Sequence, residues 1–410
     1  MFRRLAVLVI VLALLSVTLS AFAQEEPVVI RYANFTAGQD RAAELDTIIA
    51  AFEAENPGIE IEPYNMPFGD YFTMLQADFV GGDPPDAFEL NYENFVAFAA
   101  SGVLLDLSEY LSPDAPYYPQ ALAAFQYEGR QYALPETFST VVLFYNKELF
   151  DQAGLEYPTP DWTWADAIEA ARAIRALGED IWGIYSPIQF WEFYKRAAQN
   201  NCQFFNEDRT ETLINAPECV EALEVMVSLL EEDVMPDPAE QAGVSDSELF
   251  LDGRLGMVVT GIWWIPAYQE AEFEWDIQLE PGLATRAYHF FSNGIAVDVN
   301  TEHPEEAAAW AQFLTSSETA VQVRLEADWE LPTLNDMSLF ESYLAQSPPE
   351  NREVIFQSLE APVPPPTIAQ QSAMQDIFDE LLNAVIAGDL DPETALNMAK
   401  EQIDLLLVDE

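Results

Sequence analysis

The sequence is poor in the residues on which most enzyme active sites and metal centres depend. Among 410 residues it has two histidines, His289 and His303, and it contains no G-x-S-x-G, H-E-x-x-H or Walker A motif. Two isolated histidines give little support to a zinc site or to a His-based catalytic triad. His289 stands among aromatic residues, which favours a packed structural role. We expect no catalytic residue, no metal and no cofactor.

Positive charge is also scarce. The chain has 16 Lys and Arg against 71 Asp and Glu, a formal net charge of −55. Nucleic acid and anionic membranes are poor partners for such a field. The acidic residues are spread along the chain and 50% of all residues are hydrophobic, so disorder is not indicated. We interpret the acidity as a solubility feature, with a cationic ligand as the alternative. Carboxylate pairs are too common here to identify a glycosidase.

A long hydrophobic run occurs once, at the start of the chain. Arg3 and Arg4 precede an apolar stretch from Leu5, and Ala21–Ala23 supplies the small residues at a cleavage site. This pattern predicts a signal peptide over residues 1–23. A membrane anchor is the alternative, but serines and a threonine dilute the run. We expect an exported protein, periplasmic or extracellular and associated with the cell envelope. Its mature length suggests two domains.

The two cysteines, Cys202 and Cys219, are a candidate disulfide in an exported protein. The bond would close a short loop and stabilise the fold by roughly 3 kcal/mol in the chain-entropy model. Free thiols remain the alternative. The spacing does not match a C-x-x-C redox motif.

Hydrophobic periodicity predicts alternating strands and helices. The first part of the chain reads strand, helix, strand, helix, strand, helix over 28–35, 45–52, 59–64, 70–80, 87–90 and 95–99. A similar pattern restarts with a strand at Val141–Tyr145, followed by a helix at Lys147–Ala153 and a capping box at Thr163–Asp166. The order implies mostly parallel sheets with helices on both faces. Ligands would then bind beyond the carboxyl ends of strands, in the loops Asn34–Asp40 and Asn91–Asn94.

Several of the abundant aromatic residues fall where loops are expected. Trp263 and Trp264 follow Gly261 at the end of a strand, so the two indoles cannot face the same way. Flat aromatic faces next to amides and carboxylates suit sugars. Core packing explains most single aromatics, and Trp263 is the exception.

Five segments in order resemble family-1 extracytoplasmic solute-binding proteins of ABC importers, the group similar to maltose-binding protein. They are "FEAENPGIEIE", "GGDPPDAFELNYENFVAFAASGVLLDL", "YEGRQYALPETFSTVVLFYNKELFDQAGLEYPTPDWTWADAIEAA", "LFLDGRLGMVVTGIWW" and "NGIAVDVNTEHPEEAAAWAQFLTSSETAVQ". The resemblance implies a hinged, two-lobed α/β protein, each lobe a doubly wound, mostly parallel sheet with flanking helices. The implied lobes are 24–138 with 283–335, and 139–282 with 336–410.

In this family a solute binds between the lobes, and the closed form docks on the permease of an ABC transporter. Matching the motifs position by position implies cleft contacts from thirteen residues: Asn34, Phe35, Asn91, Tyr92, Glu93, Glu136, Thr137, Tyr185, Gln189, Trp191, Trp263, Ser292 and Asn293. Lys147, in the Tyr-Asn-Lys motif after the first crossing between lobes, is expected on the surface and outside the cleft.

We expect a monomeric receptor for a mono- or oligosaccharide, with no enzymatic activity. Two alternatives stay open. The same fold could bind a polyamine or another small polar solute, which would require facing carboxylates and an aromatic cage. A secreted hydrolase that uses two carboxylates is the third reading.

Overall fold

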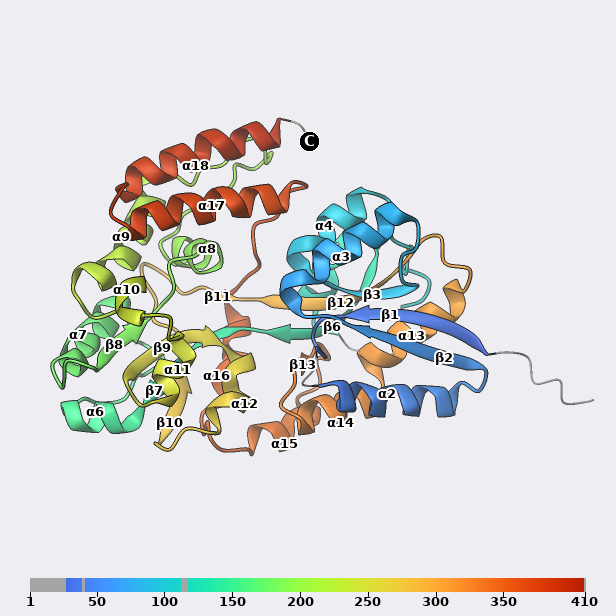
Figure 1. Cartoon of the computed structure of the whole chain (residues 1–410), viewed down its shortest axis with the longest axis horizontal. Coiled ribbons are helices and arrows are strands. Elements are labelled where there is room, and N and C mark those ends of the chain that lie inside the picture. The colour runs from blue at the N-terminus through green and yellow to red at the C-terminus, as the bar shows by residue number, and fades with distance from the viewer. Residues whose placement is uncertain (1–26, 39–40, 112–116, 409–410) are drawn as a thin grey trace, which may run out of the picture.

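The computed structural model describes residues 27–38, 41–111 and 117–408. The predicted signal peptide lies outside the described residues. Figure 1 shows two lobes, one holding β1–β3 and the other holding α6–α12, with the last two helices packed on the second lobe. No helix in the described part of the chain is long and apolar enough to cross a membrane.

The first lobe is built on a six-stranded sheet of order β13-β6-β12-β3-β1-β2. Its elements are β1 (Val28–Asn34), α2 (Ala42–Glu55), β2 (Ile59–Asn65), α3 (Phe68–Gly81), β3 (Ala87–Asn91), α4 (Tyr92–Ala100), α5 (Pro119–Ala124), β4 (Gln126–Tyr127), β5 (Arg130–Gln131), β6 (Ala133–Ser139), β12 (Phe291–Val297), α13 (Pro304–Ser316), α14 (Glu318–Glu326) and β13 (Leu331–Pro332).

The apolar stripe predicted for the first helix packs as expected. Phe52 of α2 is buried, and its ring lies 5.2 Å from that of Trp310 on α13. The Trp310 ring also meets Tyr32 of β1 at 5.4 Å. Helices from distant parts of the chain therefore share one core on this face of the sheet.

The second lobe is built on a four-stranded sheet of order β10-β7-β9-β8. This part of the chain contains β7 (Val141–Asn146), α6 (Lys147–Ala153), α7 (Trp164–Arg175), β8 (Trp182–Tyr185), α8 (Phe190–Gln199), α9 (Pro217–Glu231), α10 (Pro238–Gln241), α11 (Asp246–Leu251), β9 (Leu255–Gly261), η1 (Ile262–Trp264), α12 (Ile265–Tyr268), β10 (Trp275–Gln278) and β11 (Tyr288–His289). The C-terminal part adds η2 (Met337–Phe340), α15 (Glu341–Leu344), α16 (Glu353–Gln357), η3 (Ser358–Glu360), β14 (Pro362–Val363), α17 (Gln371–Ile386) and α18 (Pro392–Leu407).

Two predicted helix starts are confirmed in this lobe. The Asn146 side chain accepts a hydrogen bond from the Leu149 backbone N–H at 3.1 Å and caps α6. Thr163 and Asp166 form the predicted capping box at the start of α7. These signals act within one turn of the chain, so the sequence reveals them.

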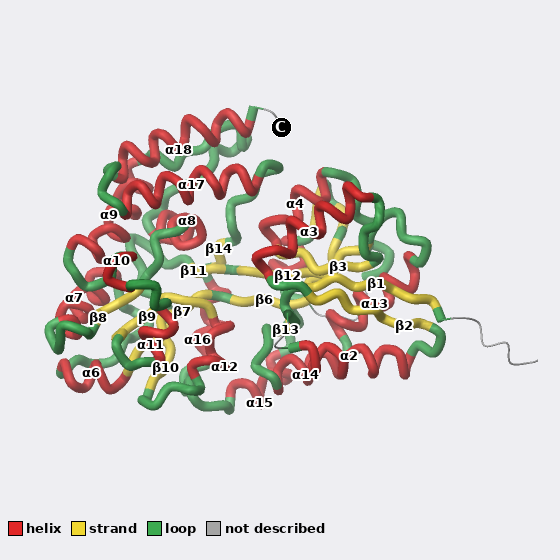
Figure 2. The backbone as a smooth tube through the Cα atoms, viewed as in Figure 1, coloured by secondary structure: helices red, strands yellow, loops and turns green. Residues whose placement is uncertain are grey.

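The expectation of mostly parallel sheets is corrected by the strand pairing. The α/β class holds, but only β1–β2, β1–β3 and β8–β9 pair in parallel among the described strands of the two large sheets. The other pairs are antiparallel. A strand that enters a lobe from the other lobe starts at the interlobe surface, whereas its neighbours end there. For this reason β12 runs antiparallel to β3, and β7 runs antiparallel to β9. Figure 2 shows β6 and β12 running side by side toward the other lobe.

Lys147 is less exposed than expected. Its ammonium group lies 3.3 Å from a carboxylate oxygen of Asp276 on the neighbouring β10, and 14% of the lysine side chain is exposed. Glu350 lies 3.6 Å away on the outer side. Lys147 therefore neutralises the buried Asp276 carboxylate. No local sequence pattern predicts this contact, because the two residues are far apart in the chain.

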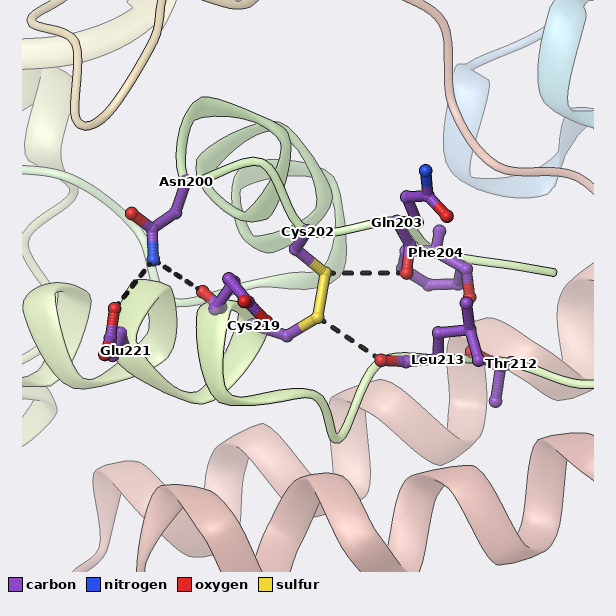
Figure 3. Close-up of a disulfide and its surroundings, with 9 residues drawn as sticks. Asn200, Cys202, Gln203, Phe204, Thr212, Leu213, Cys219 and Glu221 are labelled. Carbon is purple, nitrogen blue, oxygen red and sulfur yellow. Dashed lines mark hydrogen bonds between the residues drawn. A yellow bond between two sulfur atoms is a disulfide. The ribbon is translucent and has the colours of Figure 1, made fainter.

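Cys202 and Cys219 form the predicted disulfide. Figure 3 shows it joining the segment after α8 to the first turn of α9, with the Asn200 side chain bonded to the Glu218 carbonyl nearby. The bond closes a loop that projects beside the first lobe's α4.

Candidate functional site

A row of aromatic rings lies along the second lobe where the crossing strands arrive. We call Trp263, Phe291, His289 and Trp191 the aromatic row. The Trp263 and Phe291 ring centroids are 6.0 Å apart, Phe291 stacks on His289 at 4.8 Å, and His289 lies 5.4 Å from Trp191. Phe291 follows His289 by two residues, whereas Trp263 of η1 and Trp191 of α8 are brought beside them by the tertiary fold.

Trp263 is the most exposed member of the aromatic row, with 44% of its surface open to solvent. A Cβ atom at Gly261 would lie 2.1 Å from the Trp263 ring, so a glycine is required for the indole to fold back over the strand end. Trp264 points elsewhere and stacks on Tyr268 at 5.9 Å. The expectation that the two neighbouring indoles face different ways is confirmed.

Polar side chains form a second row across three neighbouring strands of the first lobe. In the sheet, Asn293 of β12 lies opposite both Asn91 of β3 and Thr137 of β6. We call these three residues the polar row. The Asn293 amide donates to the Glu330 carboxylate at 2.9 Å, and the Thr137 hydroxyl donates to the same oxygen. Glu330, just before β13, was not expected from the sequence.

The exposure pattern of β12 shows which side of these strands is open. Phe291 and Asn293 are half-buried, whereas Ser292 between them is buried. The Ser292 hydroxyl donates to the Thr137 carbonyl at 2.9 Å. Phe291 of the aromatic row and Asn293 of the polar row therefore lie on the same, more open side of β12, and Ser292 faces the other side. His289, Asn91 and Thr137 are buried beside them.

Two more predicted contacts are buried and already engaged. The Asn34 amide donates to the Asn65 side chain at 2.7 Å, and its oxygen accepts from the Ala37 backbone at 3.3 Å. The Glu136 carboxylate is paired with Arg324 of α14. These side chains shape the strand ends from below the surface.

Phe35, also predicted, belongs to an aromatic group at the end of β1. Its ring lies 5.2 Å from Phe68 and 5.1 Å from Tyr71. Its backbone N–H donates to the buried Glu89 carboxylate at 3.0 Å, which holds the loop after the strand in place. Phe68 is largely exposed and Glu89 is buried, and neither was expected at the site from the sequence.

The start of α4 presents the remaining predicted residues of the first lobe. Asn91 caps the helix by accepting from the Asn94 backbone at 3.2 Å, and Tyr92 and Glu93 follow. Burial raises the pKa of Glu93 to about 7. The Glu93 charge in turn helps to raise the pKa of Tyr194 on α8 of the second lobe, although burial is the larger cause. The two lobes therefore approach each other here.

The second lobe contributes the three predicted residues at and after the end of β8. Gln189 accepts a hydrogen bond of 2.7 Å from the Trp191 indole and so orients a ring of the aromatic row. Tyr185 is half-buried at the end of the strand. Burial raises its pKa, with a smaller contribution from Asp246.

A buried ionic cluster, absent from the sequence expectations, lies behind the aromatic row. Glu192 pairs with Lys195 at 2.7 Å and with Arg196 at 2.6 Å, and both cations also contact Glu280. The His289 ring lies 3.6 Å from Glu192, and burial lowers its pKa to about 4. The imidazole is therefore neutral near pH 7 and packs as a flat ring, as the sequence suggested.

The model of the family described as "Bacterial extracellular solute-binding protein" matches residues 37–321. The chain belongs to this family. Solute-binding proteins of this family are exported, and they work with the permeases of ABC transporters. The described residues contain no cluster of three or more metal-ligating side chains.

Other solute-binding proteins share the architecture. An ABC substrate-binding protein from Listeria monocytogenes, solved in complex with cycloalternan, is 41% identical with a TM-score of 0.88, covering 93% of this chain and 99% of the other. The cyclic α-maltosyl-1,6-maltose binding protein of Arthrobacter globiformis is 21% identical with a TM-score of 0.79, covering 94% and 100%. The galactooligosaccharide-binding protein of Bacillus subtilis is 21% identical over 88% of this chain and 86% of its own.

Proposed function

We propose that this protein is an exported receptor that captures a carbohydrate between its lobes and delivers it to an ABC transporter permease. Within this proposal the protein is a monomer in the periplasm or at the outer cell surface. It performs no chemistry on its ligand and binds no nucleic acid.

The observation that supports the carbohydrate is the open side of β12, where Phe291 of the aromatic row lies next to Asn293 of the polar row. A sugar ring has apolar C–H faces and a rim of hydroxyls. Trp263 and Phe291 offer flat surfaces for the C–H faces, and the half-buried Asn293 and Glu330 offer a donor and an acceptor for the hydroxyls. Thr137 is buried and holds the Glu330 carboxylate in place. A polyamine would require several free carboxylates here, whereas Glu330 is already bonded twice.

The proposed ligand contacts lie on both lobes, which explains why a ligand would close the cleft. Tyr92 and Glu93 belong to the first lobe, whereas Trp191 and Trp263 belong to the second. A ligand that contacts both sets stabilises the closed arrangement more than the open one and shifts the population toward it. The permease would then recognise the closed form.

The 41% identical Listeria protein suggests the ligand class. We propose a cyclic gluco-oligosaccharide of the cycloalternan type, since that protein was solved with cycloalternan and covers nearly the whole chain. The proposed contacts remain the exposed and half-buried members of the predicted set, joined by Phe291 and Glu330. Asn34, Glu136 and Ser292 act as supports beneath them.

The lobe boundaries are also part of the proposal. Strand membership favours crossings at Thr140, between β6 and β7, and at Phe290, between β11 and β12. The second of these lies later than the expected boundary at 282/283. A third crossing would lie between β13 and α17.

A ligand screen tests the proposal. Binding to the folded form alone raises the melting temperature by mass action. Mature protein is heated with cycloalternan, maltotriose, a galactooligosaccharide or spermidine, and positive results are repeated by calorimetry. We expect a shift with cycloalternan and no glucose release on prolonged incubation. A shift with spermidine alone would refute the carbohydrate assignment, and released glucose would refute the receptor role.

A further inference from the structure

A cavity of about 290 Å³ lies at one flank of the interlobe surface. We call it the hairpin pocket, because a short hairpin over residues 205–212 forms one wall. Its lining combines one residue of the first lobe with residues of α8, the disulfide loop and the segment before α17: Tyr92, Tyr194, Ala197, Ala198, Cys202, Phe204, Phe205, Arg209 and Val363 to Thr367. The lining is aromatic, with one cation.

That cation, Arg209, is an exception in this acidic protein. Every other lysine and arginine in the described ranges lies within 4.0 Å of a carboxylate oxygen: Arg31, Arg41, Arg130, Lys147, Arg172, Arg175, Lys195, Arg196, Arg254, Arg286, Arg324, Arg352 and Lys400. Arg209 has no such partner among the described residues. With 71 acidic residues in the sequence, an exposed arginine that lines a cavity without a carboxylate partner among the described residues is a distinctive feature.

The contacts of Arg209 leave most of its donors free. Its guanidinium lies 4.5 Å from the ring centre of Phe205, and one N–H donates to the Thr367 carbonyl. A guanidinium has five N–H donors in a planar fork. Arg209 is exposed, so with these two contacts the guanidinium retains N–H donors for a ligand while one face rests on the Phe205 ring.

The hairpin is built to hold this arginine in place. The Asn206 side chain accepts one hydrogen bond from the Thr210 backbone N–H at 2.9 Å and donates another to the Thr210 hydroxyl. Arg209 itself has a positive φ of 54°, an uncommon conformation for this residue type. The Cys202–Cys219 disulfide closes the base of the loop, as Figure 3 shows. The sulfur bridge thus restrains the loop that presents Arg209.

The first lobe completes the pocket through Tyr92. This tyrosine is half-buried at the start of α4 and lines the pocket together with Thr367, the residue whose carbonyl Arg209 contacts. The pocket is therefore assembled from both lobes. Its volume is near the low end for small-molecule sites, about 300 Å³, which suits one sugar ring and excludes a whole oligosaccharide.

We propose that the hairpin pocket is a second sugar subsite that takes one neutral hexose unit of an oligosaccharide held elsewhere by the aromatic row. Arg209 donates hydrogen bonds to the ring hydroxyls, and Tyr92 and Phe205 pack against the ring. The unit is neutral because the strongly negative field of the whole protein disfavours an acidic sugar. This inference rests on the proposed carbohydrate function and deepens it.

Calorimetry on the mature protein tests the subsite by ligand length. In Arg209→Gln, the affinity for cycloalternan should fall about tenfold or more, as expected for lost bonds to a charged group. The affinity for maltose should change less than about twofold, because a disaccharide bound at the aromatic row does not extend to the hairpin pocket. Arg172→Gln is the matched control, since it removes the same charge from an exposed arginine on α7. It should alter neither affinity.

The outcomes separate the two proposals. If the unmodified protein binds no sugar, the carbohydrate function is wrong. If it binds cycloalternan and Arg209→Gln changes both affinities equally or neither, the subsite is wrong. If Arg209→Gln lost affinity only for an oligosaccharide that contains glucuronic acid, the proposal that the pocket takes a neutral hexose would be wrong. Melting temperatures check folding, and Arg209→Lys, which keeps the charge and loses the fork, should reproduce the selective loss if Arg209→Gln fails to fold.

Discussion

The Thr140 hydroxyl donates a 2.7 Å hydrogen bond to the backbone carbonyl of His289. Thr140 lies between β6 and β7, and His289 ends β11 just before β12, so the bond joins the first two crossings between the lobes. The His289 ring also belongs to the aromatic row. A single buried contact therefore connects the hinge to the proposed ligand surface.

Thr140→Val should destabilise the protein without changing its shape. The variant keeps the side-chain volume and leaves a buried carbonyl without its donor, which lowers the free energy of unfolding by about 1–3 kcal/mol. Urea denaturation measures this change. Thr140→Ser retains the hydroxyl and should remain near the unmodified value. Equal denaturation midpoints for all three proteins would show that the bond does not stabilise the fold.

Trp263→Ala should weaken carbohydrate binding about tenfold or more, since exposed aromatic anchors dominate many binding surfaces. The melting temperature should barely change, because the indole is 44% exposed. Trp264→Ala provides the contrast: its ring stacks on Tyr268, so this variant should lower the melting temperature. Calorimetry and thermal unfolding of both variants check the assignment, which an unchanged affinity in Trp263→Ala would refute.

Glu93→Gln should change the pH dependence of stability. The carboxyl has a pKa of about 7 in the folded chain against an ordinary value of 4.5. Between these values the folded form keeps a proton that the unfolded form releases, so the free energy of unfolding falls as the pH rises. Below pH 4.5 both forms are protonated and this loss is absent.

The glutamine variant lacks this titration. Its stability relative to the unmodified protein should therefore increase from pH 4.5 to about 7 and then level off. Melting temperatures recorded for both proteins across that range measure the difference. Curves that stay parallel would mean that Glu93 titrates normally.

Replacing both Cys202 and Cys219 by serine should lower the free energy of unfolding by roughly 3 kcal/mol, the chain-entropy value for a loop of this length. The unmodified protein treated with a reductant should match the double variant in urea denaturation. If the hairpin depends on the bond, the affinity for cycloalternan should fall more than that for maltose. An unaltered denaturation midpoint would show that the bond contributes no stability.

Much of the fold could be predicted because its signals are local. The caps at Asn146 and Thr163 act within one helical turn, and the apolar stripe ending at Phe52 follows the period of one helix. The disulfide needed only two cysteines and an exported chain. Strand direction was wrong where strands cross between lobes, since pairing there depends on the path of the whole chain.

The site could be predicted only in part. Trp263 stood out because a glycine precedes it and a second indole follows. Glu330 carried no local signal, since its partners Thr137 and Asn293 lie far away in the chain. Phe291 follows His289 by two residues, but its neighbour Trp263 comes from another part of the chain. Glu280 joins Lys195 across 85 residues, a contact that spacing cannot reveal.

By itself the sequence determined the classes of interaction available: an acidic surface with few cations, abundant aromatic rings, one possible disulfide and alternating strands and helices. The alternating strands and helices can be read from the sequence because hydrophobic periodicity and helix caps depend on residues that are neighbours in the chain. Only the tertiary structure decided which side chains meet. It buried Glu136 against Arg324, aligned Asn293 with Thr137, and left Arg209 unpaired in a pocket, because charges and rings far apart in the chain are brought together by strand pairing and burial.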